Sequence, residues 1–421
     1  MKITEIFTPF DTPTVTYVER GEHKFEARLR DAYDIPKMVL SLSGPSKSGK
    51  TVLVKKVVPE ENIITISGAS LSTADDLWIK ALRWMDVPST TAKSTEQASS
   101  KSLSGSVNSG VSFLAKAEVT AGGELAKSTG SSEVSTYEYV SMEDVAREIA
   151  GSDYVVFIDD FHYIRPELRS DVGRQIKAAA EAGIRIFTAS VPHRSDDVVR
   201  SNPELRGRVV ALDLPYWSEH ELSQIAEKGF AELKVSLGDG IYRRLAAEAF
   251  GSPQLMQSIC LSLCQVLGYR SPLTELMTLN DLPDGAFNDA MLATSSFADF
   301  SKLVSALHIG AKTRGTERKI HSFSDATKGD VYRAVLLAIT LEPASLSLPY
   351  DEILSRVKGI CIGDAPVGSS INSSLEQMVA IGEDISPGTN PIAWDGDRLD
   401  ITDPYFLFYL RNSDKLSLLA R

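Results

Sequence analysis

The chain has 421 residues, of which 43% are hydrophobic and 24% are charged. These proportions are typical of folded globular proteins, and the length predicts two or three domains. Acidic residues number 56 against 44 lysines and arginines, so the formal net charge is -12. A protein dedicated to non-specific nucleic-acid binding is therefore not expected, because no general positive field is present to attract phosphate backbones.

The sequence also lacks long apolar segments. Residues 1–15 contain no apolar core of signal-peptide length, and no run approaches the ~20 apolar residues that a membrane helix needs. The three cysteines are too few and too unevenly spaced for a disulfide or zinc framework. Cys260 and Cys264 lie one helical turn apart among Leu and Ile, so we expect both to be packed in a core. These features predict a cytoplasmic protein.

A phosphate-binding loop is the most informative motif. Residues 44–51 match the pattern GxxxxGK[ST] and follow an apolar run at 38–42. In such a loop, glycines let backbone N–H groups turn inward around phosphates, and the following helix adds positive potential. Lys50 should reach the β- and γ-phosphates, and Thr51 offers a hydroxyl ligand to Mg²⁺. The predicted nucleotide-binding residues of the loop are Gly44, Pro45, Ser46, Lys47, Ser48, Gly49, Lys50 and Thr51.

A pair of acidic residues follows a second apolar run. Residues 154–158 are uninterruptedly apolar, as in a strand buried on both faces of a parallel sheet, and Asp159 and Asp160 come next. This arrangement is typical of a Walker B strand. It predicts that Asp159 completes the Mg²⁺ shell and that Asp160 polarises the attacking water. The alternative is that these acids only cap the helix that begins near Pro166.

Two more strands are predicted farther along the chain. Residues 184–190 and 209–215 are largely apolar, and Ser190 falls where a polar sensor would lie between the acidic pair and the γ-phosphate. Strands and helices alternate through residues 37–215. This pattern predicts an α/β fold with a doubly wound parallel sheet, helices on both faces, and nucleotide at the carboxyl ends of the strands.

Residues 15–270 resemble a P-loop NTPase of the AAA+ or STAND type, in the branch that includes origin-recognition and archaeal-type ATPases. The stretch Thr-Tyr-Val-Glu-Arg at 16–20 is similar to the hhxR box that lies over adenine in this group, which implies that Val18 and Arg20 belong to the base site. Residues 158–164 are similar to the DD-aromatic-His stretch of STAND transcriptional activators. The resemblance implies an ASCE-type sheet, with ATP and Mg²⁺ as ligands.

The resemblance also implies a helical lid. Gly251 and Pro253 resemble the GxP signature of the lid, which orients the base in STAND proteins. Gln254 and Leu255 follow, whereas AAA+ proteins often have an arginine there that senses the γ-phosphate. This departure favours a STAND switch over a continuously cycling motor. Asp160 stands where many related ATPases have Glu, and its shorter side chain predicts slow hydrolysis.

A basic segment precedes the last predicted strand. Residues 200–208 are similar to the segment from which AAA+ proteins project an arginine finger into a neighbouring subunit, and Arg206 and Arg208 are the candidates. Transposon-encoded AAA+ regulators have a similar stretch that leads into a Leu-Pro-aromatic-Trp end, as at 214–217. Such a finger acts only in an oligomer, because it stabilises charge in another subunit's site. A solvated basic turn is the alternative for either arginine.

Three regions are expected to follow an ATPase core at residues 1–215. They are a helical lid at 216–268, a helical connector at 269–325 and a winged-helix-like domain at 326–421. In the last region, Asp395-Gly396 lies between alternating apolar residues, which predicts the hairpin of a wing. The other elements predicted there are helices at 330–340, 350–357 and 369–381, and a segment at 403–410 that resembles the closing helix of archaeal-type STAND ATPases.

The charge of the winged-helix-like region bears on its role. Residues 325–421 carry 14 acidic and 8 basic residues, and the segment predicted as a recognition helix begins without a basic residue. Phosphate contacts supply much of the affinity for DNA, so DNA binding by this region is disfavoured, although it stays possible. A protein-packing role is favoured.

An unusual polar segment interrupts the predicted ATPase core. Ser, Thr and Gly make up 24 of the 48 residues at 89–136, where a short connection would suffice. Apolar residues nevertheless alternate with polar ones from 103 to 123, which predicts a β-hairpin. A surface ribbon or a docking edge for a partner is the favoured interpretation. A membrane-inserting hairpin in a ring of subunits is the speculative alternative.

These features together predict an ATP-binding and ATP-hydrolysing switch that depends on Mg²⁺. We expect it to act in prokaryotic signalling or anti-phage defence, as the family resemblance implies, and to be regulated by assembly into a homo-oligomer or with a partner protein. One alternative is an AAA+ regulator that assembles on DNA, as in transposition or replication. The other is a scaffold that binds nucleotide with little turnover.

Overall fold

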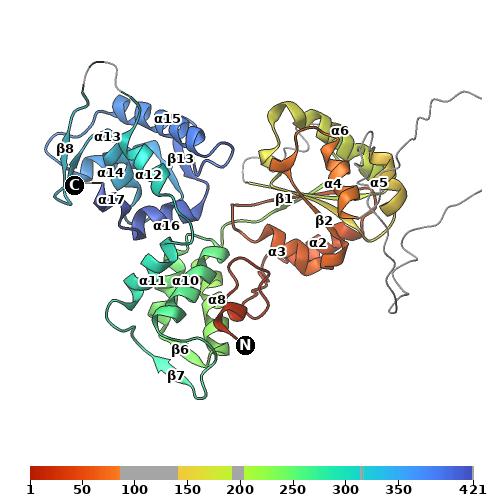
Figure 1. The fold of residues 1–421 in the computed structure, drawn as a ribbon, viewed down its shortest axis with the longest axis horizontal. Coiled ribbons are helices and arrows are strands. Elements are labelled where there is room, and N and C mark those ends of the chain that lie inside the picture. The colour runs from red at the N-terminus through yellow and green to blue at the C-terminus, as the bar shows by residue number, and fades with distance from the viewer. Residues whose placement is uncertain (86–140, 192–202, 313–314, 316, 420–421) are drawn as a thin grey trace, which may run out of the picture.

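The computed structural model describes residues 1–85, 141–191, 203–312, 315 and 317–419, and Figure 1 shows three bodies along the chain. An α/β domain is followed by a small helical body, called the lid here, and by a C-terminal domain. The polar segment at 89–136, with the hairpin predicted at 103–123, lies outside the described residues. Within the described residues, no helix is both long and apolar enough to cross a membrane.

The α/β domain contains a five-stranded parallel sheet in the order β2-β3-β4-β1-β5. The predicted α/β fold class is therefore confirmed. One strand, β4, separates β1, which leads into the phosphate-binding loop, from β3, which ends in the acidic pair, and this order is that of an ASCE-type sheet. The strands are β1 (Val39–Ser43), β2 (Ile63–Ser67), β3 (Val155–Asp159), β4 (Arg185–Ser190) and β5 (Val209–Asp213).

Helices cover both faces of the sheet (Figure 1). Alternate residues of β3 explain why, because Phe157 packs on the face covered by α2 and α3 while Val156 and Ile158 pack on the face covered by α4, α5 and α6. The helices are α2 (Phe25–Asp34), α3 (Lys50–Val57), α4 (Asp76–Trp84), α5 (Met142–Ile149) and α6 (Pro166–Ala182). Short 3₁₀ turns lie at η1 (Glu60–Asn62), η2 (Gly68–Ser70), η4 (Phe161–Tyr163) and η5 (Pro203–Leu205).

Strand β2 was not predicted from the sequence. Among the strands of the described residues, it lies at the edge of the sheet and pairs only with β3. Its residues are Ile-Ile-Thr-Ile-Ser, and from Thr65 onward exposed polar residues alternate with a buried Ile. The segment therefore lacks the continuous apolar run by which the other strands were predicted. Its place in the sheet follows from pairing with a distant strand.

In the described part of the chain, the lid is built from five helices and a two-stranded sheet. Cys260 and Cys264 are fully buried in its core, as expected. The same core also contains Ile3, Ile6 and Phe7, so the start of the chain packs with the lid helices and not with the sheet. The elements are α1 (Ile3–Ile6), α8 (Glu219–Glu232), β6 (Val235–Leu237), α9 (Asp239–Glu248), α10 (Pro253–Val266), β7 (Met277–Leu279) and α11 (Ala286–Ser295).

The C-terminal domain has the helices and the hairpin that were predicted for it. Gly396 adopts φ +98° at the turn, and the Asp395 carboxylate accepts the backbone N–H groups of Asp397 and Arg398. A small sheet of β8, β9 and β11 was not predicted. The elements are α12 (Ser301–Ile309), β8 (His321–Phe323), β9 (Lys328–Gly329), α13 (Val331–Ile339), β10 (Ser347–Pro349), α14 (Tyr350–Ile360), β11 (Cys361–Ile362), α15 (Gly368–Ile385), β12 (Ile392–Trp394), β13 (Arg398–Ile401), α16 (Pro404–Asn412) and α17 (Lys415–Leu418).

Helix α16 joins the C-terminal domain to the lid. Tyr405 and Phe408 belong to the lid core, whereas Phe406 and Leu407 on the other side of the helix belong to the core of the C-terminal domain. Arg411 adds an ion pair to Glu248 of α9 at 3.1 Å. The lid and the C-terminal domain therefore share a packed helix.

Strand β3 offers a stability test. We expect Phe157→Ala to lower the free energy of unfolding by about 3–5 kcal/mol, because the ring is fully buried in the core beneath α2 and α3. Ile362→Ala, at a side chain that is 62% exposed, should change it by less than about 0.5 kcal/mol. Urea unfolding followed by circular dichroism compares the two, and equal midpoints would contradict this packing.

Candidate functional site

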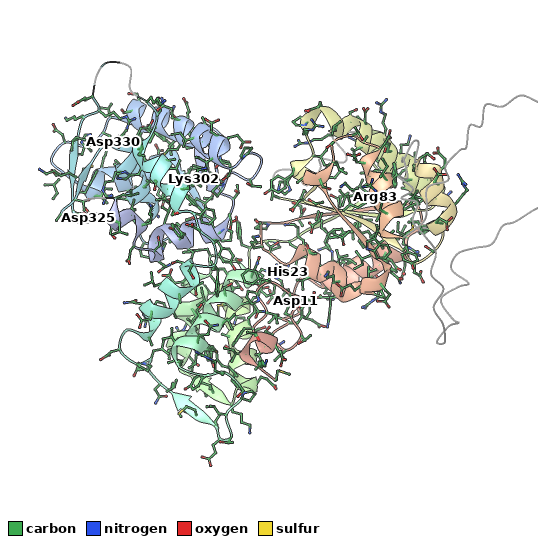
Figure 2. All side chains as sticks on the ribbon, in the orientation of Figure 1. Asp11, His23, Arg83, Lys302, Asp325 and Asp330 are labelled. Atoms are coloured by element: carbon green, nitrogen blue, oxygen red, sulfur yellow. The ribbon has the colours of Figure 1, made fainter. Side chains whose placement is uncertain are left out.

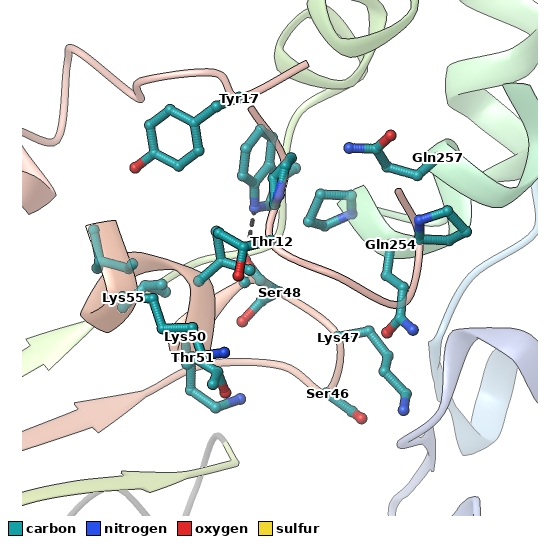
Figure 3. Close-up of a pocket in the computed structure, with 18 of the residues that line it drawn as sticks. Thr12, Tyr17, Ser46, Lys47, Ser48, Lys50, Thr51, Lys55, Gln254 and Gln257 are labelled. Carbon is teal, nitrogen blue, oxygen red and sulfur yellow. Dashed lines mark hydrogen bonds between the residues drawn. The ribbon is translucent and has the colours of Figure 1, made fainter. Parts of the chain in front are cut away.

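A cavity of about 430 Å³ lies at the carboxyl ends of the central strands, between the α/β domain and the lid. Its floor is the loop between β1 and α3, and its opposite wall combines residues 8–20 with the start of α10 (Figure 3). Asp11, which lines the cavity, and His23 mark the junction of the two bodies in Figure 2. Segments that are more than 200 residues apart in the chain therefore form one cavity.

The loop has the backbone shape that the motif requires. A Cβ atom on Gly44 would lie 2.9 Å from the carbonyl oxygen of Leu214, so only glycine fits beside β5. Gly49 adopts φ +93° immediately before α3 begins at Lys50, and the first N–H groups of that helix therefore face the loop. Ser46 through Thr51 line the cavity, whereas Gly44 and Pro45 form the base of the loop.

Lys50 is held beneath the loop. Its Nζ donates to the backbone carbonyls of Gly44 and Pro45, both at 2.8 Å, and the residue is buried. Burial lowers the pKa of Lys50 to about 8, although Asp159 and Asp160 act in the opposite direction. A phosphate group would supply the anion that this buried cation needs.

Thr51 and Asp159 come together at the same end of the cavity. The Thr51 hydroxyl donates to the Asp159 carboxylate at 2.6 Å, and the other carboxylate oxygen accepts the backbone N–H of Asp160 at 2.9 Å. These hydroxyl and carboxylate oxygens are the hard donors that Mg²⁺ prefers. The buried hydroxyl of Ser48 also has no hydrogen-bond partner among the described residues, so the loop retains capacity for a polar ligand.

Asp160 lies next to this pair in an unusual backbone conformation. Its φ of +54° is uncommon for a residue other than glycine, and it lines the cavity just before η4. Burial raises the pKa of Asp160, and the charge of Asp159 raises it further. A Cβ atom on Gly68 would lie 2.5 Å from the Asp160 carbonyl oxygen. Gly68 therefore makes room for this conformation, a role that sequence reasoning missed.

Ser190 is buried at the end of β4, in register with Ser43 of β1. Its carbonyl oxygen accepts the N–H of Gly44, the first residue of the loop, at 3.2 Å. The structure thus places Ser190 beside the start of the loop and one strand away from the acidic pair. Its role as a sensor of the γ-phosphate stays a prediction.

Val18 and Arg20, the two residues predicted from the hhxR box, differ in the contacts that they could make with a nucleotide. Val18 is buried and lines the cavity with an apolar side chain. Arg20 makes hydrogen bonds to Glu221 at 2.7 Å and to the carbonyls of Pro215 and Tyr216 at 3.0 and 3.2 Å. Most of the hydrogen-bond donors of the guanidinium group therefore already have partners within the protein. Because Glu221 lies on α8, the contact fixes residues 8–20 to the lid.

Two contacts connect the phosphate-binding loop to the lid side of the cavity. The indole N–H of Trp217 donates to the Ser48 carbonyl at 2.9 Å. The Ser252 hydroxyl, which also caps α10, lies 3.4 Å from the Lys47 carbonyl oxygen. Neither contact was predicted, because Trp217 and Ser252 are distant from the loop in sequence.

The predicted lid signature lies beside these contacts. Gly251 adopts φ +72°, and a Cβ atom on it would lie 2.9 Å from the Tyr216 ring. Pro253, which lines the cavity, is the first residue of α10, where its fixed backbone angle suits a helix start. The structure thus places Pro253 in the wall opposite the loop, whereas Gly251 lies against Tyr216 and is not among the residues that line the cavity.

Gln257 is a further wall residue that sequence reasoning missed. Its buried amide accepts the backbone N–H of Thr8 at 3.1 Å and donates to the Thr16 hydroxyl at 2.7 Å. It therefore fixes the N-terminal segment to α10. The only sequence signal was its spacing three residues after Gln254, which puts both amides on one face of the helix.

Arg206 and Arg208 are not part of this cavity. The Arg208 carbonyl accepts the N–H of Val39 at the amino-terminal start of β1, which is the opposite edge of the sheet. Arg206 is exposed, and Arg208 forms a surface ion pair with Glu181 at 3.2 Å. Neither arginine is positioned to act on the cavity of its own chain, and action in a neighbouring subunit stays a prediction.

No family model and no curated protein matches this chain. Among solved structures it is similar to Cdc6p of Pyrobaculum aerophilum, with 13% identity, 99% of both chains covered and a TM-score of 0.40. A Walker-type ATPase of Pyrococcus abyssi has 14% identity, with 94% of this chain and 99% of that chain covered and a TM-score of 0.49. The ORC2 protein of Aeropyrum pernix has 11% identity, 99% and 98% coverage and a TM-score of 0.47. At these values the similarities assign no function to this chain.

The lowered pKa of Lys50 predicts how phosphate binding depends on pH. The ammonium form, which attracts phosphate, predominates below the pKa of about 8 and is lost above it. Affinity for tripolyphosphate with Mg²⁺ should therefore fall by about tenfold per pH unit above that value, because one proton must be taken up. Calorimetric titrations between pH 7 and 9.5 measure this. Lys50→Met should bind weakly at every pH, and a constant wild-type affinity would contradict the assignment.

Proposed function

We propose that the protein is a Mg²⁺-dependent ATPase that works as a nucleotide-controlled switch. The observation that carries the proposal is the arrangement at the floor of the cavity. There Lys50 lies buried beneath a phosphate-binding loop, the Thr51 hydroxyl donates to Asp159, and Asp160 lies next to them. The cation of Lys50, the oxygen atoms that could bind the metal ion and the carboxylate of Asp160 thus lie together at the ends of the strands. Phosphoryl transfer to water needs this arrangement.

Each of these groups has a separate task in the proposed reaction. The Lys50 ammonium and the loop N–H groups neutralise and orient the phosphates, while Thr51 and Asp159 hold the metal ion. When bound, Mg²⁺ supplies further charge neutralisation at the phosphate oxygens. Asp160 orients the attacking water and accepts its proton, and burial, which raises its pKa, makes it a stronger base than an ordinary aspartate. Ser190 is placed to stabilise this arrangement from β4.

The opposite wall of the cavity suits a nucleobase. It offers apolar surface from Val18, Ile225 and Pro253, and the indole of Trp217 lies near the loop. Apolar surface favours burial of a base, and an indole can stack on one. The choice of adenine rests on the resemblance of residues 16–20 to the hhxR box.

The contacts between loop and lid support a switch. Trp217 and Ser252 bind the carbonyl oxygens of Ser48 and Lys47, which belong to the loop that would surround the phosphates. A change in the loop between ATP and ADP would therefore act directly on the lid. Because the lid shares α16 with the C-terminal domain, the change would extend to that domain as well.

We further propose that the C-terminal domain is a winged helix that packs against protein. Helices α13, α14 and α15 accompany a sheet in the order β10-β13-β12, and the excess of acidic residues does not suit DNA. Assembly on DNA, as in transposition or replication, is the less favoured function for this reason. A role in prokaryotic signalling or phage defence rests on the family resemblance alone, and a scaffold with little turnover is the outcome if hydrolysis is absent.

Two substitutions test the site. Lys50→Ala should reduce ATP binding below detection, because it removes the buried cation under the phosphates. Asp160→Asn should retain ATP binding but lower kcat by about 10²–10⁴-fold, since the base is lost. Lys358→Ala, at an exposed helical lysine of the C-terminal domain, is the matched control and should leave both unchanged. Binding is measured by calorimetry and turnover by phosphate release.

The outcomes separate the proposals. Wild-type binding and turnover in the Lys50→Ala protein would overturn the site assignment. Normal turnover in the Asp160→Asn protein would transfer the role of base to another residue. ATP binding without turnover in the wild-type protein would support the scaffold.

The arginine pair tests whether subunits complete each other's sites. If Arg206 acts in a neighbouring subunit, Arg206→Ala should lower turnover by about 10³-fold or more while leaving ATP binding intact. Mixing this protein with Lys50→Ala protein should restore part of the turnover, because the second protein supplies the finger. The same pair of measurements applies to Arg208→Ala. Unchanged turnover in both variants would favour a switch that works within one chain.

A further inference from the structure

The cavity extends along α3, away from the phosphate-binding loop. Helix α3 begins at Lys50, and Lys55, which also lines the cavity, lies five residues later, about 7.5 Å farther along the helix axis (Figure 3). Tyr17 and Glu26 line the cavity as well, and the Lys56 ammonium, 4.8 Å from the centroid of the Tyr17 ring, places them toward this second end. A nucleotide with its phosphates in the loop would therefore direct its nucleoside toward Tyr17 and Glu26.

Tyr17 holds the Glu26 carboxylate in place. The Tyr17 hydroxyl donates to Glu26 Oε1 at 2.5 Å, and burial, together with this carboxylate, raises the pKa of the hydroxyl, so it stays protonated as the donor. The Lys228 ammonium of α8 donates to the Tyr17 carbonyl at 2.6 Å. Glu26 itself lies in the first turn of α2, next to Phe25, whose ring is buried in the core. The carboxylate is therefore fixed both by its backbone and by its hydrogen bond.

The Glu26 carboxylate keeps an unused acceptor. Its second oxygen, Oε2, accepts no hydrogen bond from the described residues, and a carboxylate cannot donate one. The apolar side chains that would face a base, those of Val18, Ile225 and Pro253, belong to residues 8–20 and to the lid, whereas Glu26 belongs to the α/β domain. The ribose of a nucleotide lies between its base and its phosphates and carries two hydroxyl donors. Glu26 is therefore placed to accept hydrogen bonds from the ribose.

We propose that Glu26 binds the ribose hydroxyls of the nucleotide, and that it thereby selects ribonucleotides over nucleotides that lack these hydroxyls. This inference rests on the proposed function, since it requires nucleotide phosphates in the loop. Hydrogen bonds from hydroxyls to a charged carboxylate are stronger than those between neutral groups, so the sugar contributes to affinity as well as to selectivity. Tyr17 is a positioning residue, because its hydroxyl holds the carboxylate and leaves Oε2 to the ligand.

The test compares ADP with 2′,3′-dideoxy-ADP, which differ only in the two hydroxyls and are not consumed by the proposed hydrolysis. In calorimetric titrations with Mg²⁺, the wild-type protein should bind ADP about tenfold more tightly than the dideoxy nucleotide. In the Glu26→Gln protein the amide oxygen still accepts from Tyr17, but a neutral N–H group replaces the free acceptor. The preference for ADP should therefore fall to about threefold or less, mainly through weaker ADP binding.

Two further variants accompany this comparison. The matched control is Glu22→Gln, which removes the same charge from an exposed position outside the cavity lining and should keep the wild-type preference. Tyr17→Phe keeps the ring but removes the hydroxyl that holds Glu26, so the preference for ADP should fall by about two- to threefold. A merely structural role of Tyr17 would instead change both affinities equally.

The outcomes are distinct. Equal affinity of the wild-type protein for the two nucleotides, or an equal loss of both affinities in the Glu26→Gln protein, would overturn the inference. An equally reduced preference in the Glu22→Gln protein would overturn it too, because the effect would then belong to charge in general. Failure of the proposed function is distinguishable, because then neither ADP nor tripolyphosphate binds the wild-type protein.

Discussion

The Lys50 ammonium is buried beneath the loop that precedes its helix, where it donates to the carbonyls of Gly44 and Pro45. A cation in such a place is costly unless negative charge is close by, and burial accordingly lowers its pKa to about 8. The groups around Lys50 meet this need for negative charge. Two aspartates end the strand β3 beside it, the loop supplies N–H groups around it, and a phosphate group would complete the set of charges.

The remaining wall of the cavity is made by residues 8–20 and by the lid. Residues 8–20 are fixed to the lid by Gln257 and by the Arg20–Glu221 pair, and the lid is in turn fixed to the loop by Trp217 and Ser252. The proposed base and phosphate ends therefore belong to different bodies. A nucleotide bound between them would join the α/β domain to the lid. A movement of the lid would then also move the C-terminal domain, because α16 packs in the lid core.

Local patterns in the sequence predicted the features that depend on neighbouring residues. The loop motif, the apolar strand before Asp159 and the turn at Gly396 all have signals within a few residues. The edge strand β2 and the space that Gly68 provides for Asp160 have no such signals, because each depends on contact between distant segments. The packing of the first residues on the lid was missed for the same reason.

The central claim is that one nucleotide lies between the loop and the lid. Hydrogen exchange of the backbone amides, with and without ATP and Mg²⁺, tests it most directly, because exchange slows where N–H groups become hydrogen-bonded or enclosed. The account predicts simultaneous slowing in residues 44–51 of the loop and in residues 251–257 at the start of α10. Slowing in neither segment, or in the lid alone, would contradict it.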